Sequence, residues 1–429
     1  MLDETVPNGA IAPRQTRIAP ALILAHAELA VRGHERWIVP QGGLVLGREA
    51  VAGDYQLVDA RLSRRHAAIE PDGQGGLQVR DLGSRNGTGV NGHRAAGAHR
   101  LAHGDVLRLG DTLLVFAAAG LAPASAVPSG ALLGVSAAMG QVRHAVEQLA
   151  RAPVHVLVRG EGGTGKESIA RALHAASAPR GPFVAIAPGG ATDAALEAQL
   201  NAAWQAGATI YLDGVSELPG ALQAQLARAL APPAVPVRVI AATSRDLGEL
   251  ARLGAFLPEL HALLAAHTVH VPPLRERRED LPLLVADALA HAGAPGRAVE
   301  ADLAQALLLS AWPLNRRGLA SVIEASLAAA APGAPLALVD EVAHMFAVGD
   351  AMTATAAPAS PPPPTSTDAS SLARARAPIA DELRQALRAS SGNVAEAARH
   401  FGCSRQQMYR WMRAVGVDLS EFRAAPPAR

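Results

Sequence analysis

A glycine-rich turn between two patterned runs constrains the fold of this chain more than any other stretch. The apolar, β-branched segment 154–158 predicts a buried strand, and the pattern of 168–174 predicts a helix. The turn between them consists of Gly160, Glu161, Gly162, Gly163, Thr164, Gly165, Lys166 and Glu167. Glycines let backbone N–H groups turn inward, the lysine adds a positive charge, and the helix N-terminus adds its dipole. The stretch therefore predicts a nucleotide phosphate-binding loop, the alternative being a glycine-rich turn that holds no ligand.

A second apolar run, 208–212, ends at Asp213 and predicts the neighbouring strand of such a site. Asp213 is placed to hold Mg²⁺ through its water shell, so ATP and Mg²⁺ are the expected ligands. At the next position a carboxylate would polarise the attacking water, but Gly214 has no side chain for that task. Glu217 is interpreted as a surface residue at the start of a helix. These residues predict nucleotide binding with doubtful hydrolysis.

Composition limits the remaining possibilities. The length of 429 residues predicts two to four domains, and 3% aromatic content requires cores built from Ala, Leu and Val. A single cysteine, Cys403, excludes an intrachain disulfide framework and a multi-cysteine zinc site. Prolines interrupt the charge-poor stretch 112–142, and no N-terminal signal pattern is found, so we expect a soluble cytoplasmic protein without membrane contact. The net charge of +1 means that any nucleic-acid surface must be local.

After a tail at 1–20, segment 21–119 contains short strands separated by turn residues, which predicts an all-β sandwich. Its loops carry Gly47-Arg48, Ser63-Arg64-Arg65-His66, the run 81–88 and Val90-Asn91-Gly92. These clusters resemble the forkhead-associated (FHA) domain, which binds phosphothreonine peptides. The arginine and hydroxyl groups suit a phosphate dianion in their own right. The resemblance implies that Arg48, Ser63, Arg64 and Ser84 contact the phosphate and that Asn86 contacts the peptide backbone. His66 is expected to be structural. An FHA fold without phosphopeptide binding is the alternative.

An Ala/Pro/Ser-rich linker, 120–131, precedes a region, 132–349, in which strand and helix signals alternate and then become helical. Five segments in order (133–139, 160–167, 237–247, 271–280 and 311–317) resemble the AAA+ domain of sigma-54-dependent activators. The resemblance implies an α/β P-loop domain with a helical lid, and it places Arg317 near the nucleotide phosphates.

The departures from that family concern remodelling rather than binding. The GAFTGA loop that contacts sigma-54 should lie between Phe183 and Asp213, but the interval 187–207 is too short and lacks the motif. The positions of the two trans-acting arginines hold Leu257 and Leu263. An arginine finger contributes about 10³–10⁵ in rate. Together with Gly214, these changes predict a degenerate domain with little ATPase activity and no contact with sigma-54 RNA polymerase.

The chain closes with a Pro/Ala/Ser-rich linker at 350–377, a helical unit at 378–420 and a tail at 421–429. Helix, glycine turn and helix predict a helix-turn-helix that resembles the Fis-type DNA-binding domain. Its second helix presents polar groups suited to phosphates and base edges, namely Ser404, Arg405, Gln406, Gln407, Tyr409, Arg410 and Arg413. The expected partner is double-stranded DNA, and the resemblance implies at least a homodimer. A three-helix interaction module is the alternative.

Together these regions predict a multidomain, DNA-binding transcriptional regulator that receives a phosphothreonine signal. The signal would come from a protein modified by a Ser/Thr kinase, or from Thr365 or Thr367 of the chain's own linker. Two other hypotheses remain open. One is a working ATPase that activates sigma-54 promoters, and the other is a phosphopeptide-dependent scaffold.

Overall fold

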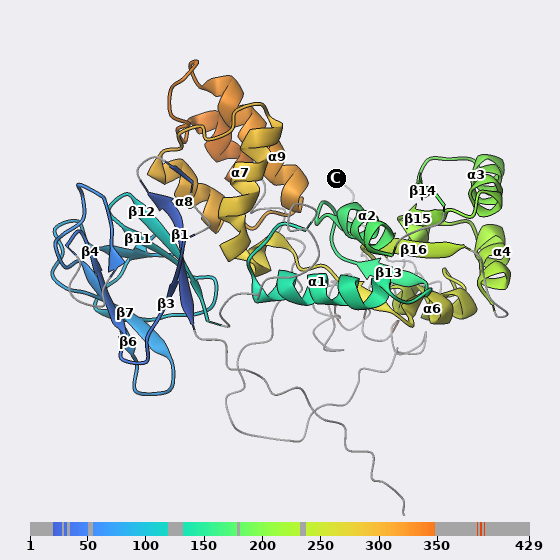
Figure 1. Cartoon of the computed structure of the whole chain (residues 1–429), viewed down its shortest axis with the longest axis horizontal. Coiled ribbons are helices and arrows are strands. Elements are labelled where there is room, and N and C mark those ends of the chain that lie inside the picture. The colour runs from blue at the N-terminus through green and yellow to red at the C-terminus, as the bar shows by residue number, and fades with distance from the viewer. Residues whose placement is uncertain are drawn as a thin grey trace, which may run out of the picture. The chain divides into compact units, whose positions relative to one another are not determined.

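The computed structural model describes residues 20–27, 30–31, 35–49, 55–118, 132–177, 181–231 and 237–347, together with Arg384, Leu387 and Ser390. The chain divides into two compact units, 1–357 and 358–429. The first unit contains a β-sandwich, a parallel α/β sheet and a helical lid (Figure 1).

The N-terminal sandwich consists of two sheets, as predicted. One has the order β2-β1-β12-β11-β8-β9, with β3 also paired to β1. Its strands are β1 (Ala21–Ala27), β2 (Ala30–Val31), β3 (Arg36–Ile38), β8 (Thr88–Val90), β9 (His93–Arg94), β11 (Val106–Leu109) and β12 (Thr112–Ala117). The other sheet, of order β10-β7-β6-β4-β5, contains β4 (Leu44–Gly47), β5 (Tyr55–Gln56), β6 (Ala67–Pro71), β7 (Leu77–Asp81) and β10 (Ala98–Arg100). Alternating residues such as Leu46, Ile69 and Leu107 are buried between the sheets.

The central domain has a five-stranded parallel sheet of order β14-β15-β16-β13-β17. The strands are β13 (Val156–Arg159), β14 (Phe183–Ile186), β15 (Thr209–Asp213), β16 (Arg238–Thr243) and β17 (Thr268–His270). One face packs on α1 (Ala137–Ala150) and α2 (Lys166–Ala176). The other packs on α3 (Asp193–Gln205), α4 (Gly220–Leu230), α5 (Leu247–Arg252) and α6 (Pro258–Ala265). Successive residues of β15 alternate between these two cores, because side chains alternate along a strand.

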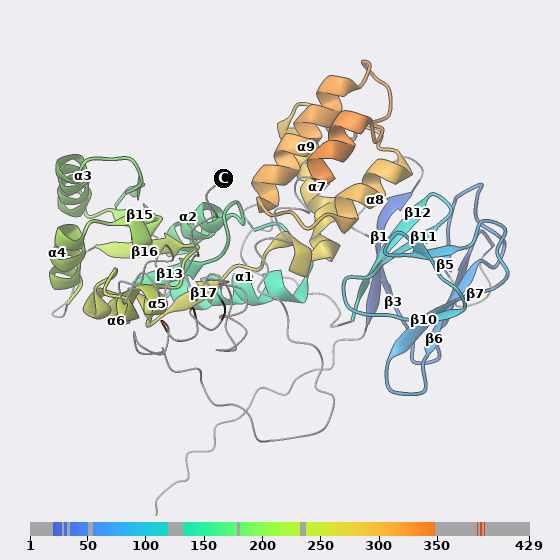
Figure 2. The same cartoon turned by 180° about the vertical axis from the view of Figure 1, so that it is seen from behind.

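The predicted helical lid follows. It begins with two short 3₁₀ turns, η2 (Leu274–Glu276) and η3 (Arg278–Asp280), and continues with α7 (Leu281–His291), α8 (Ala301–Leu309) and α9 (Asn315–Ala329). A further 3₁₀ turn, η1 (Val215–Glu217), follows β15 in the central domain. Glu217 therefore ends a single turn, which corrects the expectation that it starts a helix. In both views the lid stands next to β1 and β12 of the sandwich (Figure 2).

In the C-terminal unit, Arg384 and Leu387 are helical and Ser390 lies in a turn. Leu387 is fully buried. Ser404, Arg405, Gln406, Gln407, Tyr409, Arg410 and Arg413 lie outside the described residues. Within the described parts of the chain, the helices are too short or too polar to span a bilayer.

Candidate functional site

The predicted phosphate-binding loop connects β13 to α2. The amide of Gly160 donates to Thr243 O of β16 at 3.1 Å, which fixes the start of the loop to the sheet. Gly163 and Gly165 have φ values of +74° and +99°, a region that favours glycine. Gly165 is the N-cap residue of α2, and no side chain caps this end of the helix. The first-turn N–H groups of α2 therefore remain available for an anion.

Lys166 begins α2 and points back over the loop. Its Nζ donates to Gly160 O at 3.0 Å and to Glu161 O at 2.9 Å. Burial lowers the pKa of Lys166, the nearby carboxylate of Asp213 raises it, and the nearby Arg317 lowers it further. A Cβ on Gly163 would lie 3.3 Å from Arg317 Cβ, so Arg317 of the lid lies beside the phosphate loop.

Glu161 ties the loop to the lid. Arg275 donates to its two carboxylate oxygens at 2.8 and 2.5 Å, and Asn315 donates to Oε2 at 3.2 Å. Hydrogen bonds from Arg275 lower the pKa of Glu161. Asn315, at a left-handed φ of 49°, also donates to Gly162 O at 3.0 Å. Arg275 and Asn315 were not predicted as site residues, although both lie in segments matched to the AAA+ family.

The position that should activate water lacks a side chain. Asp213 is exposed and accepts a hydrogen bond from the Tyr211 hydroxyl at 3.2 Å. Gly214 has φ +82°, and a Cβ there would lie 3.6 Å from Glu217 Oε1. Among the described residues, no three acidic, His or Cys side chains cluster as a metal site.

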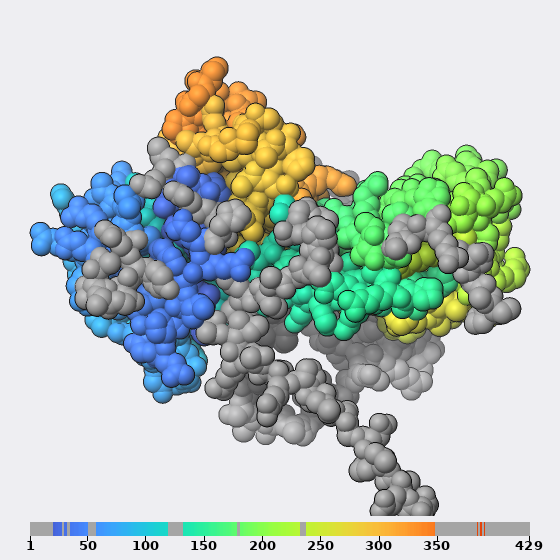
Figure 3. Space-filling view, viewed as in Figure 1, coloured from blue at the N-terminus to red at the C-terminus, as the bar shows by residue number. Residues whose placement is uncertain are grey.

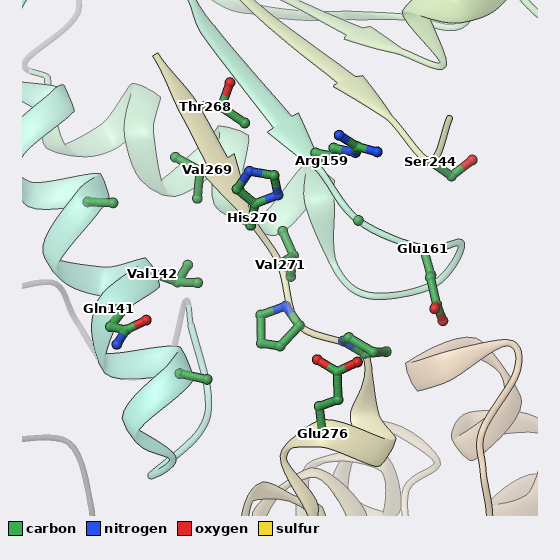
Figure 4. A pocket seen from close by; sticks show the side chains of 15 residues that line it. Gln141, Val142, Arg159, Glu161, Ser244, Thr268, Val269, His270, Val271 and Glu276 are labelled. Carbon is green, nitrogen blue, oxygen red and sulfur yellow. The ribbon is translucent and has the colours of Figure 1, made fainter. Parts of the chain in front are cut away.

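A cavity of about 560 Å³ opens beside the loop, at the carboxyl ends of β13 and β17 (Figure 4). Val142 and Val271 supply apolar walls, and His270 and Glu276 supply polar groups. Of the predicted nucleotide residues, only Gly160 and Glu161 line it. The cavity thus adjoins the phosphate loop, whereas Lys166, Asp213 and Arg317 lie outside its lining.

The structure also shows the positions of the two other departures from the AAA+ family, the missing GAFTGA loop and the missing arginines. The interval between β14 and β15 contains one uninterrupted helix, α3, whose N-cap Thr192 accepts from Ala195 N. Leu257 and Leu263 are half-buried and pack against the apolar core below the sheet. Their side chains contribute to packing and carry no charge.

The loops at one end of the sandwich bring the predicted phosphate-contacting arginines together. A Cβ on Gly47 would lie 2.1 Å from Arg64 O, so glycine permits the two loops to meet. Arg48 N donates to Ser63 O at 3.0 Å. Arg48 and Arg64 have exposed side chains, as an anion site requires. The Ser63 hydroxyl accepts from Arg85 N at 3.0 Å.

Two other loop residues stabilise the turn itself. His66 is buried and its Nε2 lies 3.1 Å from Gly87 O, which is the structural role expected for it. The Ser84 hydroxyl donates to Asp81 Oδ2 at 2.6 Å and accepts from Gly87 N at 2.9 Å. The Ser84 hydroxyl thus bonds within its own loop in this structure. Asp81, whose pKa is lowered to about 2 by the hydroxyls and amides bonded to it despite burial, was not predicted.

Asn86 is exposed, and its Nδ2 donates to Arg61 O at 2.6 Å. This contact orients the side-chain amide of Asn86 between the loop at 63–66 and the loop at 81–88. The side-chain oxygen of Asn86 stays available to a peptide N–H.

Comparisons with known proteins agree with this architecture. Residues 44–110 match the model of the FHA domain, 133–274 that of the sigma-54 interaction domain, and 380–414 that of the bacterial regulatory proteins of the Fis family. The C4-dicarboxylate transport transcriptional regulatory protein DctD of Rhizobium meliloti (strain 1021) is 31% identical over 330 residues, covering 69% of this chain and 67% of the relative. The chain belongs to the family of sigma-54-dependent transcriptional regulators.

Another relative in this family is the transcriptional regulatory protein GlrR of Escherichia coli (strain K12). It is 31% identical over 311 residues, covering 64% of this chain and 66% of GlrR. Among solved structures, NtrX from Brucella abortus in complex with ATP is 25% identical, with coverage of 67% and 69% and a TM-score of 0.44. The multidomain organisation of FHA, AAA+ and Fis-type regions predicted from the sequence is therefore confirmed.

Proposed function

We propose that this family member is a DNA-binding regulator that binds ATP with Mg²⁺ and receives a phosphothreonine signal, with little nucleotide turnover. The observation that carries the proposal is the contrast around the phosphate loop. Lys166 of the loop interacts electrostatically with Asp213 and Arg317. The residue after Asp213 is Gly214, whose backbone is left-handed. Binding groups are retained, and the water-activating group is absent from its usual position.

The AAA+ domain would then act as a nucleotide-responsive or oligomerising platform. The uninterrupted α3 and the apolar Leu257 and Leu263 support a platform that neither contacts sigma-54 nor supplies arginine fingers. Exposed Arg48 and Arg64, beside the Ser63 hydroxyl, support phosphothreonine recognition by the sandwich. The match of 380–414 to the Fis family supports duplex DNA binding, with at least two copies of the chain on one site.

The test is ATP binding by calorimetry and multiple-turnover phosphate release on the full chain, with Lys166→Ala as the variant. Loss of its charge-assisted contacts should weaken ATP binding by about 100-fold. Arg228→Ala, which removes an exposed cation from α4, is the matched control and should bind as wild type does.

Lys166-dependent binding without turnover agrees with the proposal. Turnover that rises with protein concentration and disappears in Lys166→Ala would instead indicate a working activator ATPase. Retained nucleotide binding without salt-sensitive duplex binding would favour a phosphopeptide scaffold.

A further inference from the structure

The sandwich and the lid share one apolar core. Val106, Leu113 and Val115 of the sandwich pack in the same buried cluster as Leu303 and Leu307 of α8. Strands β1 and β12 lie beside α7 and α8 in both cartoon views, and the two regions touch in the space-filling view (Figure 3). Because this face of the sandwich is buried against the lid, the sandwich is docked on the AAA+ domain rather than only tethered to it.

Polar contacts also join the sandwich to the lid. His26 is buried, with Nε2 2.6 Å from Val299 O of the lid and Nδ1 3.0 Å from Asp111 O of the sandwich. Arg108 of β11 donates to Asp302 Oδ1 at 2.7 Å and to Gln305 Oε1 at 3.1 Å on α8. These contacts hold the outer side of the interface.

The inner side is formed by four consecutive residues, 277–280, which we call the junction turn. Arg277 Nη2 donates to Thr164 O of the phosphate loop at 3.3 Å. Arg278 Nη1 donates to Gly104 O of the sandwich at 3.4 Å, and Glu279 Oε1 lies 3.5 Å from His103 Nε2.

The fourth residue of the junction turn, Asp280, accepts from Val135 N at 2.6 Å and from Ser136 N at 2.7 Å, where α1 begins. One short segment therefore touches the phosphate loop, the sandwich and the start of the AAA+ domain.

The junction turn is incompletely satisfied. Arg277 Nε, Arg278 Nε and Glu279 Oε2 are buried without a hydrogen-bond partner. Buried polar atoms without a partner are unfavourable, and few occur in a folded protein. The three consecutive residues therefore have polar atoms that another arrangement of the turn could bond. A segment of this kind can respond to a change on either side.

The sandwich end of this connection reaches the phosphopeptide loops. Asp105 accepts from Ala102 N at 2.8 Å and from Asn91 Nδ2 at 2.7 Å, which ties the loop carrying His103 to the end of β8. Strand β8 begins at Thr88, directly after the loop that contains Ser84 and Asn86, and Thr88 Oγ1 donates to Asp81 Oδ2 at 2.7 Å. Hydrogen bonds and main-chain connections thus lead from the phosphate loop, through the junction turn, to the sandwich loop that contains Ser84 and Asn86.

We propose that the junction turn couples nucleotide binding at the phosphate loop to the conformation of the phosphopeptide-binding sandwich. This inference rests on the proposed function, since it requires that the loop at 160–167 binds ATP. Coupling is reciprocal, so an effect of ATP on the sandwich implies an equal effect of phosphopeptide on ATP affinity.

The experiment is hydrogen exchange of the full chain with and without saturating Mg-ATP. In wild type, ATP should change exchange at 160–167 and also at 101–106, the latter by at least about five-fold, the lower end of typical coupling. In the double variant His103→Ala/Arg278→Ala the change at 101–106 should disappear while the change at 160–167 persists. Two controls, His99→Ala on the exposed face of β10 and Asp302→Ala at the outer side of the interface, should behave as wild type.

The outcomes separate the two proposals. A change confined to 160–167 in wild type overturns the coupling and leaves nucleotide binding intact. Loss of the distant response in Asp302→Ala as well as in the double variant overturns the specific role of the junction turn. No change at 160–167 in wild type contradicts the proposed function, and the coupling with it.

Discussion

The phosphate loop keeps its charged side chains, whereas the turnover positions, Gly214, Leu257 and Leu263, lack the carboxylate and arginines expected from the family. At the loop, the charged groups of Glu161, Lys166 and Arg317 are present, and Arg275 of the lid holds Glu161 in place. At the turnover positions, the residues are a glycine and two leucines that pack against a core. The groups proposed to bind nucleotide lie on a local strand–turn–helix and on lid residues that contact it, whereas hydrolysis needs side chains added at separate positions. The two properties can therefore separate within one fold.

Breaking the binding side of the comparison should have the largest effect. In Gly163→Ala, the added Cβ would lie 2.1 Å from Leu314 O at a φ of +74°. The left-handed conformation and the backbone clash together should cost about 3 kcal/mol or more in the free energy of unfolding. They should also abolish ATP binding, because the loop and the lid cannot both keep their positions. Urea unfolding and calorimetry measure the two effects.

Gly162→Ala is the matched control for that variant. A Cβ at Gly162 meets nothing within 4 Å, and its φ is not positive. Near-normal stability and ATP binding are expected. Equal loss in both variants would mean that any side chain in the loop is harmful, and that the contact with Leu314 is not the cause.

The junction turn of the lid can be tested through the pH dependence of the free energy of unfolding. Burial raises the pKa of Glu279 to about 7, with Asp280 raising it and Arg277 lowering it. Burial also lowers the pKa of the facing His103. The neutral form of Glu279 thus contributes stability that is present below pH 4.5 and is lost as pH rises through about 7.

Glu279→Gln keeps the shape of the side chain and removes that titration. Its free energy of unfolding should match wild type near pH 4.5 and exceed it by about 3 kcal/mol at pH 8, given 1.36 kcal/mol per pKa unit. The measurement is urea unfolding across this pH range, with Glu259→Gln at the exposed start of α6 as control. A constant difference at all pH values would show that Glu279 does not titrate as a buried group.

The sequence predicted the strand–turn–helix of the phosphate loop because its determinants lie within about twenty neighbouring residues. It did not predict the partners of Glu161, since Arg275 and Asn315 are 114 and 154 residues away. Motif matching placed both in family segments without saying what they touch. Contacts at such separations depend on how the lid folds back, which periodicity does not encode.

The sandwich illustrates the same limit on a smaller scale. Its short apolar strands were predicted, whereas two-residue strands such as β5 and β9 carry too little pattern to be found. The hydrogen bond from the Ser84 hydroxyl to Asp81, three residues earlier, was not predicted. The shared core with the lid also escaped prediction, because strand β12 is buried along its whole length and shows no exposed, polar face.

Restoring the turnover side of the comparison should have the smallest effect. Gly214→Glu supplies the missing carboxylate, but residue 214 is left-handed and its Cβ would lie near the carboxylate of Glu217. We expect a loss of about 1–2 kcal/mol in stability from the backbone conformation and no increase in phosphate release. Gly214→Ala, with the same backbone cost and no carboxylate, is the control. Because Leu257 and Leu263 would still lack charge, a carboxylate alone leaves the developing phosphate charge uncompensated. Turnover in Gly214→Glu well above that of Gly214→Ala would show that one residue, rather than the backbone turn and the missing arginines together, separates binding from hydrolysis in this chain.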